Sequence, residues 1–242
     1  MAGPSTRAIG LAFENHTQRF LNGDLRMALS HVGGRGDGGV DLRGFWWVPR
    51  RPRRRTAKAT PSPLEAEGSG TGSENGAWKP PTPPGLKRDG TPGARIRPLR
   101  VVAQCKAERR VVGPRIVREF EGTLAHLAAQ DARVPLLGVL ASQSGFSLAS
   151  MEHAVRARVP LLLLHLEGGR PEEEGESDDA PPEKDVVEGA PAISVTGAWW
   201  NAPLGALLTE TGVELRREIM DGNTRVGLWT AGSRMGRYGP AG

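Results

Sequence analysis

The feature that most constrains the fold is the alternation of apolar runs with amphipathic segments between residues 99 and 166. Three separate runs of mainly apolar residues, at 99–105, 134–142 and 159–166, each have the length of a strand and predict three buried strands. Apolar residues at helical spacing predict the two helices between them, at 114–130 and 147–158. Strands that alternate with helices in this way predict an α/β fold with at least part of its sheet parallel.

Residues 1–48 add one predicted helix and two short strands to this core. The helical pattern occupies residues 9–30, with its end indicated by Asn22 and Gly23. The segments 27–32 and 40–48 have strand character. The core is therefore expected to comprise residues 1–48 and 99–166.

Two polar stretches interrupt or follow the core. Residues 49–98 contain ten prolines and an arginine-rich run, and predict a disordered Pro/Arg-rich insertion. Residues 167–191 are acidic and lack any periodic pattern, so a second disordered insertion is expected there. Residues 192–242 are predicted to form a C-terminal extension packed on the core, with a helix near 203–219.

The charge of the chain is distributed unevenly. Residues 1–110 hold 20 Lys and Arg against 9 Asp and Glu, whereas residues 111–242 hold 12 against 18. A polyanion is the natural partner of such a basic segment, and nucleic acid is the commonest one. Exposed basic residues that keep a chain in solution give the same composition, so charge alone leaves both interpretations open.

The sequence argues against several other classes of protein. No apolar run approaches the roughly 18 residues of a membrane span. The single cysteine, Cys105, excludes an intramolecular disulfide framework and a cysteine-based zinc site. Residues 1–5 lack the apolar segment of a secretory signal, and Glu14 and Asp24 interrupt any basic amphipathic stretch of the kind found in transit peptides, so no clear presequence is expected.

A group of polar residues is expected where segments 40–48 and 99–105 pair as an antiparallel hairpin. Asp41 would then lie beside Gln104 and Lys106, which share one face because strand side chains alternate. Mg²⁺ binds oxygen ligands, usually with one or two protein carboxylates. Asp41, the Gln104 side-chain carbonyl and the Cys105 backbone carbonyl would supply a partial shell. Lys106 would orient water and balance charge on phosphate, which is what phosphodiester hydrolysis requires.

These residues resemble a known superfamily. The segments GGRGDGGVDLRG (33–44) and VAQCK (102–106) are similar to the Mrr-like branch of the PD-(D/E)xK nucleases, in which Gln often replaces the second acid. A glutamate on the first helix completes the site in that branch, and Glu14 matches it. The segment GPRIVREFEG (113–122) resembles a fungal mitochondrial family named for being required for respiratory growth, whose members share this core.

The resemblance implies a restriction-endonuclease-like three-layer core, with a central mixed β-sheet flanked by helices. It implies Asp41, Gln104 and Glu14 as catalytic residues that bind Mg²⁺ or Mn²⁺, Lys106 as the catalytic lysine and Asp37 as a secondary acid. It also implies DNA as the nucleic acid and the mitochondrion as the location. Cutting both strands of a duplex would need two such domains, and a homodimer would meet that need.

Other residues have less specific roles. Arg43, Arg115 and Arg118 are candidate contacts to nucleic-acid phosphates, although solvated arginines on a helix face are the simpler explanation for the last two. His16 is expected at the surface or behind the metal ligands, and the Cys105 side chain in the core. Two alternatives to a nuclease remain: the same fold retained for nucleic-acid binding without cleavage, and a structural accessory protein of the mitochondrial expression machinery.

Overall fold

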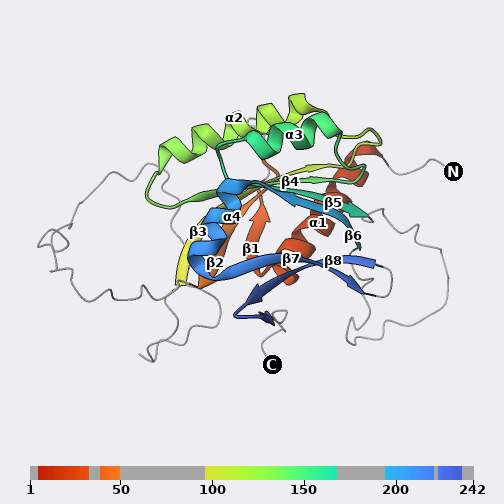
Figure 1. The fold of residues 1–242 in the computed structure, drawn as a ribbon. Helices are drawn as coiled ribbons and strands as arrows, with labels where there is room; N and C mark the ends of the chain where they lie inside the picture. Colours follow the sequence, from red (N-terminus) through yellow and green to blue (C-terminus); the bar gives the residue numbers. More distant parts are fainter. Residues whose placement is uncertain (1–4, 33–38, 50–95, 168–193, 221–222, 236–242) are drawn as a thin grey trace, which may run out of the picture.

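The computed structural model describes residues 5–32, 39–49, 96–167, 194–220 and 223–235 (Figure 1). Its helices and strands, in chain order, are α1 (Thr6–Gly23), β1 (Met27–His31), β2 (Leu42–Pro49), β3 (Ile96–Lys106), α2 (Pro114–Gln130), β4 (Leu136–Ser142), α3 (Leu148–Arg156), β5 (Leu161–Glu167), β6 (Ser194–Trp200), α4 (Ala202–Thr211), β7 (Val213–Met220), β8 (Asn223–Thr230) and β9 (Ser233–Arg234). No helix among these is both long and apolar enough to cross a membrane.

The main sheet of the described residues has six strands in the order β1-β2-β3-β4-β5-β6. Neighbouring strands are parallel from β3 to β5 and antiparallel elsewhere. The predicted α/β class with a mixed sheet is therefore confirmed. The predicted hairpin is also present, because β2 pairs antiparallel with β3 and sets Leu42 opposite Ala103.

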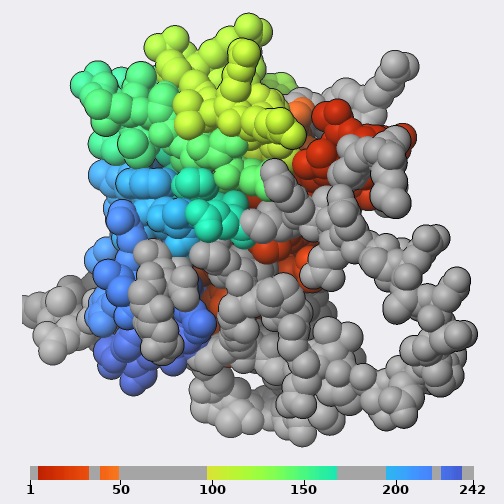
Figure 2. Space-filling view, turned by 90° about the vertical axis from the view of Figure 1, so that its right-hand side faces the viewer, coloured from red at the N-terminus to blue at the C-terminus, as the bar shows by residue number. Residues whose placement is uncertain are grey.

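Two buried clusters cover the two faces of this sheet. Val102 and Leu140 pack with α2 and α3 on one face. Val101 and Val139 pack on the other face, in a cluster that includes residues of α1, α4 and the small sheet β7-β8-β9. Figure 2 shows the α2 and α3 layer at the top of the molecule and the C-terminal strands, in blue, well below it. The sheet thus separates two covering layers.

The C-terminal prediction of a helix over 203–219 is wrong in its second half. Helix α4 ends at Thr211, where Gly212 takes a positive φ of 71° that caps the helix. Val213 and Leu215 are then buried on one face of β7, which pairs with β8. A strand competes with a helix here because β8 supplies a partner, and that partner is not visible from a local helical pattern.

The two predicted insertions, 49–98 and 167–191, fall almost entirely outside the described residues, as does Asp37. The register nevertheless fixes where the first one joins the sheet, since Pro49 of β2 pairs with Ile96 of β3. Asp41 lies just before the other end of β2. At roughly 3.3 Å per residue, the eight residues of β2 put about 25 Å between the insertion point and Asp41.

Candidate functional site

The candidate site lies where β1 ends, β2 begins and β3 ends. Because β2 pairs antiparallel with both β1 and β3, these three strand ends lie at the same edge of the sheet, the edge formed by the carboxyl end of β3. His31 is the last residue of β1, Asp41 directly precedes β2, and Lys106 is the last residue of β3. The predicted hairpin therefore places Asp41 at the same edge as the Gln104–Lys106 segment.

Asp41 is held by both neighbouring strands. Its backbone oxygen accepts from the amide of Val32 at 2.9 Å, and its own amide donates to the carbonyl of Ala103 at 3.0 Å. The Cys105 amide donates to Asp41 Oδ2 at 2.6 Å. A short bond to a carboxylate is typical of a charge-assisted contact. The Asp41 carboxylate is therefore fixed against the end of β3.

The side chain of Gln104 packs against Gly39. A Cβ at Gly39 would lie 2.6 Å from Gln104 Nε2, and the φ of Gly39 is +75°, so a glycine is needed there for two reasons. Gln104 Oε1 is buried and accepts no hydrogen bond from the described residues. A buried acceptor without a partner costs about 1–3 kcal/mol. The Gln104 oxygen therefore has unused acceptor capacity near the end of β3.

A second motif glycine also has a steric reason. A Cβ at Gly44 would lie 1.9 Å from the backbone oxygen of Ala28 on β1. The GGVDLRG segment therefore contains glycine both where β2 approaches β1 closely and where the chain turns past Gln104. Part of the motif thus serves packing, and Asp41 is the acidic residue within its described part, 39–44.

Glu14 reaches this edge from α1. Its Oε2 lies 3.4 Å from His31 Nδ1, and the other ring nitrogen of His31 lies 2.9 Å from Asn15 Oδ1. Both side chains of the Glu14–His31 pair are about 30% exposed, at 27% and 31%. The sequence pointed to Glu14 but missed His31, whose position at the end of β1 was the available signal.

The charges of the predicted residues act together on Cys105. Burial raises the pKa of the Cys105 thiol, the carboxylates of Asp41 and Glu14 raise it further, and Thr17 and the Lys106 ammonium act in the opposite direction. These groups therefore surround one position on β3. The thiol stays protonated at neutral pH, so it supplies no nucleophile.

The three candidate arginines occupy different places. Arg43 is half-buried on β2, opposite Val102 of β3. Arg115 and Arg118 are exposed on α2, and Arg115 Nε donates to Glu119 Oε1 at 2.7 Å. Arg115 is thus already paired within its own helix. Contact of any of the three with nucleic acid stays a prediction.

His16 is buried, so of its two predicted positions the surface one is wrong, and the place behind the candidate metal ligands stays a prediction. It is 8% exposed, and Nε2 lies 3.0 Å from the backbone oxygen of Glu167 at the end of β5. Burial lowers the pKa of His16, which favours the neutral ring. The spacing of apolar residues does not mark His16, because its partner is a backbone oxygen on a distant strand.

The candidate ligands at this end of the sheet are oxygen atoms. Within the described ranges, no three His, Cys, Asp or Glu side chains are grouped to hold a metal ion. The predicted set would combine the carboxylates of Asp41 and Glu14 with the Gln104 amide oxygen and the Cys105 carbonyl. Glu14 belongs to α1, which packs on the sheet face of Val101, whereas Gln104 alternates with Val102 onto the other face, so the two would have to meet around the end of β3. Only oxygen atoms are offered, which suits Mg²⁺ or Mn²⁺. The unpartnered Gln104 Oε1 is the observation that a cation would explain.

A family model described as Required for respiratory growth protein 7 matches residues 5–185. The chain belongs to this family. The matched range extends from α1 through β5 and includes Glu14, Asp41, Gln104 and Lys106. The family carries the name of a protein required for respiratory growth, in agreement with the resemblance seen in the sequence.

Two relatives of this family share the same printed name, Required for respiratory growth protein 7, mitochondrial. The one from Saccharomyces cerevisiae (strain ATCC 204508 / S288c) is 28% identical over 179 residues, which cover 72% of this chain and 71% of the relative. The one from Zygosaccharomyces rouxii is 29% identical over 160 residues, covering 65% and 63%. Their names confirm the expected mitochondrial location. No solved structure matches the chain.

Replacing Gln104 with methionine is expected to separate stability from metal binding. Methionine keeps the size of the side chain and removes the unpartnered oxygen, so the metal-free protein is expected to be as stable as wild type or about 1 kcal/mol more stable. Wild type is expected to gain thermal stability with MnCl₂ over EDTA, and Gln104→Met is expected to lose that gain. Thermal unfolding followed by circular dichroism measures both quantities.

The matched control is Gln18→Met on α1. Gln18 Nε2 donates to the carbonyl of Leu29 at 2.8 Å, so this amide is satisfied. Its removal is expected to lower stability and to leave the response to MnCl₂ intact. A Gln104→Met protein that is less stable than wild type in EDTA, or that keeps the full response to MnCl₂, would contradict a ligand role for Gln104.

Proposed function

We propose that this protein is a metal-dependent nuclease with a restriction-endonuclease-like core of the PD-(D/E)xK type, which hydrolyses phosphodiester bonds of DNA in mitochondria. The observation that carries the proposal is the buried, unpartnered oxygen of Gln104 beside the anchored carboxylate of Asp41. Lys106 follows two residues later on the same strand. The QxK pattern thus has its acid, its amide and its lysine at one edge of the sheet.

Each residue has a distinct part in this proposal. Asp41, Gln104 and Glu14 would hold Mg²⁺ or Mn²⁺, with the Cys105 carbonyl as a further oxygen. When bound, such a cation supplies Lewis acidity toward phosphate and lowers the pKa of a coordinated water. Lys106 would orient the attacking water and place its positive charge beside the phosphoryl oxygens as negative charge develops. His31 would keep Glu14 turned toward the site.

The mitochondrial setting is supported by the names of the relatives, and DNA is the substrate that the superfamily resemblance favours. The six-stranded mixed sheet with helices on both faces is compatible with the proposed core. A nuclease that maintains mitochondrial nucleic acid would serve a family named for respiratory growth.

The test is cleavage of end-labelled single- and double-stranded DNA and RNA by the full chain, with MgCl₂, MnCl₂ or EDTA. We expect cleavage of DNA that requires a divalent cation and stops in EDTA. Activity that continues in EDTA would contradict the metal dependence. Cleavage of RNA alone would replace the substrate while keeping the chemistry.

A second candidate, nucleic-acid binding without cleavage, is favoured by two specific observations. Asp41 Oδ2 is already engaged by the Cys105 amide, and the middle ligand of the pattern is a neutral amide rather than an acid. Both features reduce the negative charge available to a cation. Tight, salt-sensitive binding of DNA with no turnover in any metal would favour this candidate over the nuclease.

A further inference from the structure

The segment that follows the candidate lysine is the most basic stretch around the site. Residues 106–118 contain five Lys and Arg residues against one acid, Glu108. The segment begins at the last residue of β3 and enters α2. A concentrated positive charge of this kind attracts the phosphates of a polyanion.

The connection between β3 and α2 is held in place by the β4–α3 connection. Gln143 N donates to the carbonyl of Lys106 at 3.0 Å, and Ser144 Oγ donates to the carbonyl of Glu108. Val112 is clamped on both sides, because its amide donates to Gly145 at 2.9 Å and its carbonyl accepts from the Ser147 amide at 3.1 Å. The connection, residues 107–113, therefore forms a platform that these hydrogen bonds hold in place.

Two arginines project from the middle of this platform. Arg109 and Arg110 are exposed, and neither forms an ion pair or side-chain hydrogen bond with the described residues. Arg115 differs, because it is paired with Glu119. A paired guanidinium must break its contact before it binds a phosphate, whereas Arg109 and Arg110 need not.

We propose that Arg109 and Arg110 bind the phosphate backbone of nucleic acid next to the phosphodiester bond at which Lys106 would act. This inference rests on the proposed function and names the residues that hold the substrate. The guanidinium group presents several N–H donors in a plane, which matches the oxygens of a phosphate. The hydrogen-bonded loop keeps both groups within a few residues of Lys106, so binding there would place a backbone phosphate next to the site.

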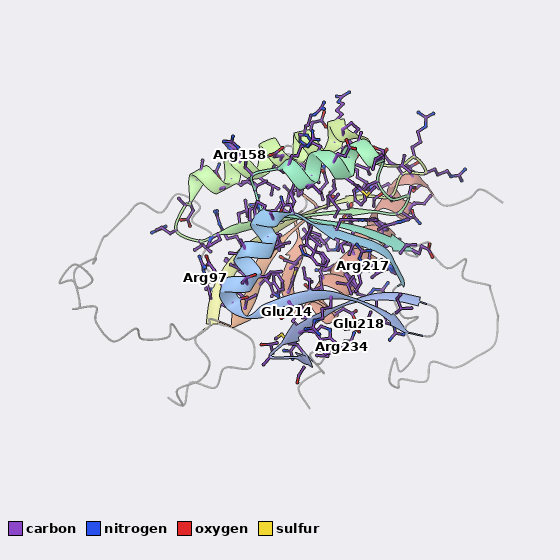
Figure 3. The ribbon with its side chains drawn as sticks, viewed as in Figure 1. Arg97, Arg158, Glu214, Arg217, Glu218 and Arg234 are labelled. Atoms are coloured by element: carbon purple, nitrogen blue, oxygen red, sulfur yellow. The ribbon has the colours of Figure 1, made fainter. Side chains whose placement is uncertain are left out.

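The test compares two double variants that remove equal charge. Arg109→Gln/Arg110→Gln alters the platform. Arg156→Gln/Arg158→Gln alters two exposed arginines at the other end of the sheet, at the end of α3 and just before β5 (Figure 3 labels Arg158). Binding of a short fluorescein-labelled DNA duplex is followed by anisotropy in EDTA, so that no cleavage occurs. The salt dependence of Kd is measured for the wild-type chain and both variants.

We expect the platform variant to bind DNA about tenfold or more weakly near 0.1 M salt. The plot of log K against log salt is expected to become less steep by roughly 1.8, which corresponds to the loss of two phosphate contacts. The control variant is expected to change Kd less than threefold, about the effect of long-range charge alone. Equal effects of the two variants on Kd would overturn the assignment of phosphate binding to Arg109 and Arg110. The conclusion that the protein binds DNA would still stand in that case. Absence of DNA binding by the wild-type chain would overturn the proposed function together with the inference.

Discussion

Cleavage of DNA is expected to fall by at least about a thousandfold when Asp41 is replaced by asparagine, a loss of roughly 4 kcal/mol of transition-state stabilisation. In the wild-type protein the Cys105 amide donates to Asp41 Oδ2 at 2.6 Å. Asparagine has the same shape as aspartate and keeps a side-chain oxygen that can accept this bond. The substitution therefore removes charge and preserves the anchor. Initial rates on labelled DNA in MgCl₂ and MnCl₂, with circular dichroism to verify folding, measure the effect.

A carboxylate far from the site provides the control. Asp131 follows α2, and its Oδ1 accepts from the backbone amide and the guanidinium of Arg133, contacts that hold the pKa of Asp131 below its usual value. Asp131→Asn removes the same charge and is expected to cleave DNA at the wild-type rate. An Asp41→Asn protein that folds and cleaves within tenfold of wild type would show that Asp41 is not a metal ligand.

The neighbourhood of the site could be predicted because the relevant information is local in two segments. Asp41 and Gln104 belong to strands whose apolar patterns are clear, and the strands pair antiparallel as expected. Once the pairing is correct, the alternation of side chains follows from strand geometry. The intervening 49–98 does not affect this reasoning, since it joins the hairpin at Pro49, about 25 Å from Asp41 by strand rise.

The contacts that complete the site could not be predicted in the same way. His31 meets Glu14 only because α1 lies against the sheet, and the sequence does not give the rotation of a helix about its axis. His16 is buried because its ring reaches the backbone of Glu167, which is 151 residues away in the chain. Polar residues of this kind pair across elements, and their pattern is invisible to a count of apolar spacing.

The C-terminal region illustrates the same limit on a larger scale. Val213 and Leu215 are compatible with either a helix or a strand, and the outcome depends on β8, which pairs with β7 over its whole length. Gly212 is the local signal that α4 ends. A positive φ at that position separates the two elements, and a glycine after a short apolar helix is a common sign of such an end.

Lys106 decides between the two candidate functions more directly than any metal ligand. Lys106→Met keeps an unbranched side chain that is shorter by about one atom, and it removes the ammonium group. We expect the rate of DNA cleavage to fall by about 10²–10³, the loss seen when one group that stabilises developing charge is removed. Binding of the same DNA in EDTA is expected to weaken only slightly, by no more than the loss of about one phosphate contact.

Arg158→Gln is the control for this variant, because it removes one positive charge near the start of β5, at the other end of the sheet. It is expected to change neither the rate of DNA cleavage nor the DNA affinity by more than about threefold, because salt screens a charge this far from the site. A Lys106→Met protein whose cleavage falls only in proportion to its DNA affinity would show that Lys106 holds phosphate and takes no part in the chemistry. A large loss of rate at nearly constant affinity is the signature of a residue that acts in the transition state, because binding alone would lower both together.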